Sequence, residues 1–147
     1  MDKGSYALKG GCNLRFFFGS IRYSEQVDPA VTAAYRLSPI LTNHYDAATA
    51  ARQKLEALQS RKAPQARDVF DLHLLRSAGA DIGRAAREAG LSLPDLQARV
   101  MDITQPMFVG QVLAYLPPEE QARYADPHVW DSMVLNVADA LLEESAP

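Results

Sequence analysis

The stretch that decides the fold lies between positions 46 and 80 and reads DAATAARQKLEALQSRKAPQARDVFDLHLLRSAGA. Apolar residues recur in it at spacings of four and three, as one buried helix face requires: Ala47, Ala51, Leu55 and Leu58. Asp46 is of a residue type that caps helix N-termini. A polar break at 60–64 separates this helix from a second, which we expect to carry Pro64 in its first turn and to stop near Gly79. The stretch therefore predicts two consecutive helices.

Similar patterns continue to the C-terminus. They predict further helices over 81–89, 93–103, 108–116, 119–124 and 126–142, with Asp126 as the last N-cap. The apolar residues of the last helix are Val129, Trp130, Met133, Val134, Val137, Leu141 and Leu142. This part of the chain predicts an array of about six helices with short connections.

The first 28 residues have a different pattern. A short apolar run, Tyr6 to Leu8, ends at Gly10 and Gly11, and these glycines precede a second apolar stretch. We expect a strand, a glycine turn and a short helix here. The predicted fold is therefore mainly α, with a small N-terminal α+β part over 1–28 and a helical domain over 29–147.

Composition limits the classes of function. Of the 147 residues, 48% are hydrophobic and 22% are charged, so a core can form, and the net charge of −3 gives no bulk case for nucleic-acid binding. The single cysteine, Cys12, excludes a disulfide framework and a zinc cluster and favours a cytoplasmic setting. No apolar run is long enough to cross a bilayer, so we expect no membrane association.

A first group of candidate binding residues surrounds the glycine pair. Lys9, Gly10 and Gly11 precede the expected short helix, and Arg22 follows it. Two glycines let backbone N–H groups approach a phosphate, and a helix N-terminus favours an anion. The alternative is an ordinary strand-to-helix turn with scattered surface arginines.

A second group lies on the two helices of the deciding stretch. Lys54 is on the first, and Arg67, Asp68 and Asp71 are on the second. Asp68 and Asp71 are three residues apart, so they share one helix face, where two carboxylates can hold a metal or accept a proton. The alternative is a solvated helix face on which Arg67 pairs with Asp71, four residues away.

Two sets of strings resemble motifs of the AbiEii-type nucleotidyltransferase toxin family of bacteria. The string ALKGGCNLRFFFGSIRYSE at 7–25 is similar to that family's first motif. The strings QKLEAL at 53–58, followed by Arg61, and QARDVFDL at 65–72 are similar to its third and fourth motifs, in the expected order. The residues beyond Gly79 carry no such signature.

The resemblance implies a polymerase-β-like nucleotidyltransferase fold with a helical C-terminal part. It also implies transfer of a nucleotidyl group from a nucleoside triphosphate, with Mg²⁺, to an RNA or protein acceptor. Gly10, Gly11 and Lys54 would contact the phosphates, with Lys9, Arg22 and Arg67 adding positive charge. Asp68 would act on the acceptor and Asp71 would help to set its position. The implied partner is a winged-helix antitoxin, as in abortive-infection systems.

The chain departs from the family pattern after Glu25. Gln26 occupies the position of the first metal-binding acid, and an amide cannot supply its charge. Asp28 is the remaining candidate metal ligand in this region. About 25 residues separate Glu25 from Lys54, where the family has several further strands, which indicates an internal deletion that removed most of the catalytic sheet.

Three functional hypotheses follow. The chain is an active nucleotidyltransferase of reduced size, a catalytically inactive remnant that still binds nucleotide or a partner, or a small helical interaction protein unrelated to the family. A structure that places Lys54 far from Asp68, with both side chains facing solvent, would favour the third.

Overall fold

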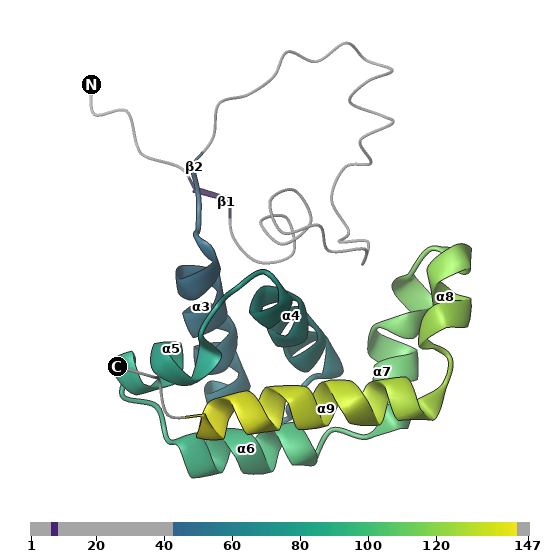
Figure 1. Cartoon of the computed structure of the whole chain (residues 1–147). Helices are drawn as coiled ribbons and strands as arrows, with labels where there is room; N and C mark the ends of the chain where they lie inside the picture. The colour runs from purple at the N-terminus through teal and green to yellow at the C-terminus, as the bar shows by residue number, and fades with distance from the viewer. Residues whose placement is uncertain (1–6, 9–42, 144–147) are drawn as a thin grey trace.

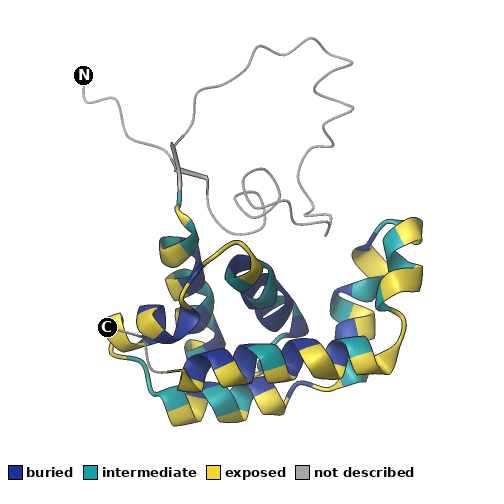
Figure 2. Cartoon of the chain, in the orientation of Figure 1, coloured by how far each residue is buried: buried dark blue, intermediate teal, exposed yellow. Residues whose placement is uncertain are grey.

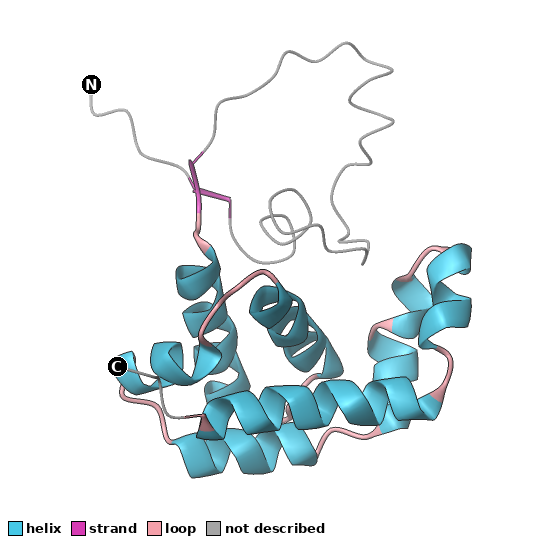
Figure 3. Cartoon of the chain, viewed as in Figure 1, coloured by secondary structure: helices cyan, strands magenta, loops and turns pink. Residues whose placement is uncertain are grey.

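A computed structural model describes residues 7–8 and 43–143 and shows a mainly helical protein (Figures 1 and 3). The N-terminal candidates Lys9, Gly10, Gly11, Arg22 and Asp28, and the short helix expected after the glycines, lie outside the described residues. The elements are β1 (Ala7–Leu8), β2 (Asn43–His44), α3 (Ala47–Ser60), α4 (Ala66–Ser77), α5 (Ile82–Glu88), α6 (Leu93–Met101), α7 (Gln105–Gln111), the 3-10 helix η1 (Leu113–Tyr115), α8 (Pro118–Tyr124) and α9 (Pro127–Leu142).

Two residues of the N-terminal part form β1, which pairs in parallel with β2, Ala7 opposite Asn43 and Leu8 opposite His44. No sequence pattern predicted β2. With two residues each, these strands are far below the size of an independently stable sheet, so the helices determine the described fold.

Side-chain caps and glycine stops set the helix boundaries. Asp46 accepts a hydrogen bond from the backbone N–H of Thr49 at 2.7 Å, as its N-cap position predicted. Gly79 and Gly90 have φ of 92° and 65° and follow the C-caps of α4 and α5. After α4, the N–H of Ala80 bonds back six-to-one to the carbonyl of Leu75, which is the Schellman arrangement that a left-handed glycine permits.

Two predicted boundaries are wrong. Pro64 does not lie in the first turn of α4; the helix begins after Gln65, because the backbone preceding it is extended (ψ 132° at Gln65). The helix predicted over 108–116 begins earlier, at Gln105, with Pro106 in its first turn, and it breaks at Val112 (φ −129°) before η1.

The core is one cluster of buried side chains: α3 packs against α4, α5 and α6, and α9 packs against α4 to α8 (Figure 2). Trp130 of α9 is 1% exposed and stacks on Phe108 of α7, with ring centroids 4.6 Å apart. Its indole N–H donates to the carbonyl of Ile103 at 3.3 Å. Of the apolar residues predicted for α9, Val129 is half-buried and Leu142, the last residue of the helix, is 58% exposed, and the others are buried.

Candidate functional site

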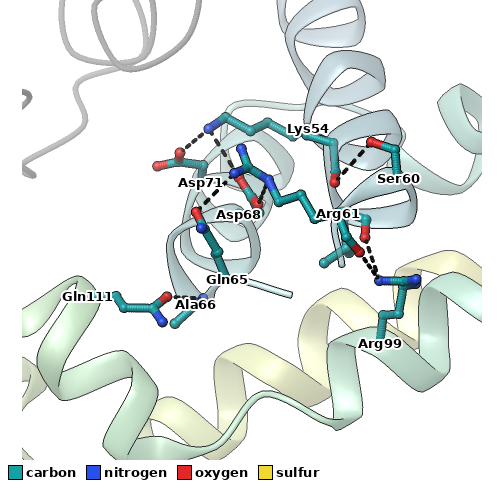
Figure 4. A network of polar contacts seen from close by, with 11 residues as sticks. Lys54, Ser60, Arg61, Gln65, Ala66, Asp68, Asp71, Arg99 and Gln111 are labelled. Atoms are coloured by element: carbon teal, nitrogen blue, oxygen red, sulfur yellow. Dashed lines mark hydrogen bonds and ion pairs between the residues drawn. The ribbon is translucent and has the colours of Figure 1, made fainter. Parts of the chain in front are cut away.

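The fold brings Lys54 of α3 against two aspartates of α4. The Lys54 ammonium lies 2.6 Å from Asp71 Oδ2 and 3.5 Å from Asp68 Oδ1. Asp68 and Asp71 share a face because they are three residues apart on α4, and α3 packs against α4 (Figures 1 and 4). One ammonium therefore joins two carboxylates across the helix pair.

These groups are removed from solvent. The side chains of Asp68 and Asp71 are 0% exposed and that of Lys54 is 14% exposed. Moving an ionised carboxylate out of water is costly unless cations and hydrogen bonds compensate. The alternative of a solvated helix face is therefore wrong for these two aspartates.

Arg61 provides a second cation. It is the C-cap residue of α3, and its Nε lies 3.1 Å from Asp68 Oδ2. Its Nη1 donates to Gln65 Oε1 at 3.1 Å. We call Lys54, Arg61, Asp68 and Asp71 the charged cluster; it contains two cations and two anions, which balances its formal charge.

The connection between α3 and α4 is fixed at both ends by side chains from distant helices (Figure 4). At the end of α3, Arg99 Nη1 of α6 donates to the carbonyls of Arg61 at 2.8 Å and Leu58 at 3.3 Å. At the start of α4, Gln111 Oε1 of α7 accepts from the backbone N–H of Ala66 at 2.8 Å. Gln65, the N-cap residue, makes no side-chain hydrogen bond to the first turn of α4. Gln111 therefore supplies the acceptor for the first N–H of this helix, which has no partner within the helix.

The structure separates the predicted site residues into three sets. Lys54, Asp68 and Asp71 come together. Arg67 does not join them: among the described residues it forms no ion pair with Asp71 or Asp68, and Asp68 contacts Arg61 instead. The N-terminal candidates lie outside the described residues, so the glycine-turn prediction stays a prediction.

Sequence reasoning gave no role to Arg61, Gln65, Arg99 or Gln111. Arg61 had a usable signal, because it lies seven residues after Lys54 and so falls on the same side of α3. Arg99 and Gln111 gave no such signal in the sequence, because Arg99 is 38 residues from Arg61 and Gln111 is 45 residues from Ala66.

The charged cluster does not suit Mg²⁺. The Lys54 ammonium already lies between its two carboxylates, and Arg61 contacts the other oxygen of Asp68. A hard divalent cation needs several free oxygen ligands. No group of three or more His, Cys, Asp or Glu side chains suited to a metal occurs in the parts of the chain that the structure describes.

Comparisons of the chain with protein-family models, with curated proteins and with solved structures find no match. Within residues 7–8 and 43–143, none of the helices has the length and apolar character of a membrane-spanning segment.

Proposed function

We propose that the chain is a nucleotidyltransferase-family protein of the toxin–antitoxin type that binds a nucleoside triphosphate through Lys54 but has impaired transfer activity. The observation that carries the proposal is the contact of Lys54 with Asp68 and Asp71, at 3.5 and 2.6 Å, inside the protein. These residues come from the two strings, at 53–58 and 65–72, that resemble separate family motifs. The hypothesis of unrelated surface charges would be favoured by a Lys54 far from Asp68 with both in solvent, and these residues are in contact and largely buried.

The energetics of buried charge favour a binding role over a purely structural one. Buried ion pairs are often no more stabilising than apolar residues of similar volume, because desolvation offsets the attraction. Lys54 is only 14% exposed, and its ammonium contacts one carboxylate oxygen of Asp68 and one of Asp71. Such an ammonium can exchange a carboxylate for a triphosphate oxygen, while Asp68 keeps its contact with Arg61.

Asp68 is the group we assign to the acceptor side. The resemblance gives it that role, and Arg61 and Lys54 fix the position of its carboxylate in the structure. Impaired transfer follows from Gln26, whose amide replaces an acid in the family pattern, and from the short distance in sequence between Glu25 and Lys54. No catalytic step is assigned to a metal at the charged cluster.

Calorimetry of the full chain with each of the four nucleoside triphosphates and Mg²⁺ tests binding. At least one should bind, and Lys54→Met should weaken it by roughly tenfold or more, because a charge-assisted contact is lost. Arg52→Met is the matched control: it removes an exposed cation of the same helix, paired with Glu56 at 3.8 Å, and should leave affinity unchanged. Absence of binding by folded wild-type chain to all four nucleotides would refute the proposal.

Transfer of labelled nucleotide to RNA or protein tests the second half of the proposal. We expect little or no transfer, and no growth arrest on expression in a bacterium without the winged-helix antitoxin. Robust transfer that is lost in Asp68→Asn would show that the chain is an active enzyme, and would contradict the impairment while supporting the family assignment.

The alternative of a non-catalytic partner-binding module is favoured by one feature. Leu135 and Leu142 of α9 are 52% and 58% exposed and lie seven residues apart, so they share a helix face. In that case Leu135→Ser would weaken a partner complex, such as one with the antitoxin, and leave nucleotide binding unchanged.

A further inference from the structure

The charged cluster depends on a residue outside every motif string. Arg99 of α6 donates from one guanidinium nitrogen to the carbonyls of Arg61 and Leu58. These carbonyls belong to the last turn of α3 and its C-cap, where the helix leaves orphan acceptors. Arg99 therefore fixes the backbone from which the Arg61 side chain extends to Asp68 (Figure 4).

We propose that Arg99 is a positioning residue for the charged cluster: it holds the C-terminal end of α3 so that Arg61 stays on Asp68 and Lys54 stays between Asp68 and Asp71. For its effect on nucleotide affinity, this inference rests on the proposed function. For its effect on the geometry of the cluster, it rests on the contacts alone.

The contacts form a continuous chain of polar groups. Arg99 Nη1 lies 2.8 Å from the Arg61 carbonyl, Arg61 Nε lies 3.1 Å from Asp68 Oδ2, and Asp68 Oδ1 lies 3.5 Å from Lys54 Nζ. The first contact joins α6 to the end of α3, and the second joins the end of α3 to α4. The third joins α4 to the middle of α3.

Two features show why the contact of Arg61 with Asp68 depends on Arg99. Arg61 is 34% exposed, so solvent competes for its guanidinium once its backbone is free to move. Gln65, the other partner of that guanidinium, lies in the same connection and moves with it. Arg99 and Gln111 are the side chains that tie this connection to the rest of the described helices. Loss of Arg99 should therefore release Arg61 from Asp68 and admit water to Lys54.

The test compares Arg99→Met with Arg76→Met. Arg76 of α4 is a matched control, because its guanidinium also binds a carbonyl of another helix, that of Asn136 on α9, as well as Glu143 at 2.6 Å. Both variants lose a contact between a guanidinium and a backbone carbonyl. Only Arg99 belongs to the series of contacts that leads to Lys54. Arg99→Lys, which keeps a donor, should restore part of the wild-type behaviour.

The first readout needs no nucleotide. Acetylation of lysines in the folded full chain is followed by mass spectrometry, with an added lysine-containing peptide as the reference, because Lys62 lies in the connection that Arg99 holds. Arg99→Met should raise the Lys54 rate relative to that peptide by roughly tenfold, since a released ammonium loses its carboxylate partners. Arg76→Met should leave that ratio unchanged, even if its thermal unfolding midpoint falls as much. An unchanged ratio in Arg99→Met, or an equal rise in both variants, would overturn the inference.

The second readout is the affinity for the nucleoside triphosphate that binds most tightly. Arg99→Met should weaken it by a factor similar to that of Lys54→Met, and Arg76→Met should not. If wild-type chain binds no nucleotide but the Lys54 acetylation ratio still rises only in Arg99→Met, the positioning role stands and the proposed function fails. If nucleotide binds and neither readout responds to Arg99→Met, the positioning role fails and the proposed function stands.

Discussion

At the scale of single residues, Asp68 is the centre of the charged cluster. Its two oxygens contact different cations, Lys54 and Arg61, and its side chain has no exposed surface. Asp68→Asn keeps the shape but leaves two buried or half-buried cations with one anion. We expect it to lower the free energy of unfolding by about 3 kcal/mol, as loss of one partner of a buried pair does. Urea denaturation followed by the fluorescence of Trp130 measures this.

Asp131→Asn is the control for that prediction. Asp131 is exposed on α9, so its neutralisation should change stability by less than about 0.5 kcal/mol. Equal changes in the free energy of unfolding would mean that the contacts of Asp68 with Lys54 and Arg61 add no stability to the protein.

At the scale of elements, α5 and α9 approach closely at one glycine. A Cβ built on Gly83 of α5 would lie 2.5 Å from the carbonyl oxygen of Ala140, a backbone atom of α9 that cannot simply rotate away. Gly83→Ala should therefore force the helices apart and cost about 1–3 kcal/mol. Thermal unfolding and the near-ultraviolet signal of Trp130 are the measurements.

Gly110→Ala provides the matched comparison. Gly110 lies in α7, and a Cβ there meets nothing within 4 Å. Because alanine loses less backbone entropy in a helix, this substitution should stabilise the protein by roughly 0.5–1 kcal/mol. Opposite signs for the two substitutions are the expected result, and a stabilising Gly83→Ala would contradict the close approach.

At the scale of the whole molecule, we expect α9 to make the described helices one cooperative unit. It packs against α4, α5, α6, α7 and α8, and Trp130, the chain's single tryptophan, lies in its buried face. Far-ultraviolet circular dichroism and Trp130 fluorescence should therefore give coincident urea transitions. Two separated midpoints would show instead that α3 and α4, with the charged cluster, unfold independently of α9.

Sequence periodicity and end signals determined much of the helical fold. Asp46 and Asp126 are N-caps as predicted, Asp81 caps α5 although it was expected inside the helix, and Gly79 and Gly90 follow the ends of α4 and α5. These signals are local, because a cap or a left-handed glycine acts within one helical turn. The break of the predicted 108–116 helix at Val112 escaped prediction, because the residues there carry no stop signal of their own.

By itself, the sequence determined the helices and the presence of Lys54, Asp68 and Asp71 on two of them. Tertiary structure alone decided that these charges are buried together, that Arg61 rather than Arg67 contacts Asp68, and that Arg99 holds the end of α3. The physical reason is the distance along the sequence over which each interaction acts. Helix periodicity and capping depend on neighbours a few residues apart, whereas burial and charge pairing depend on which helix faces pack together.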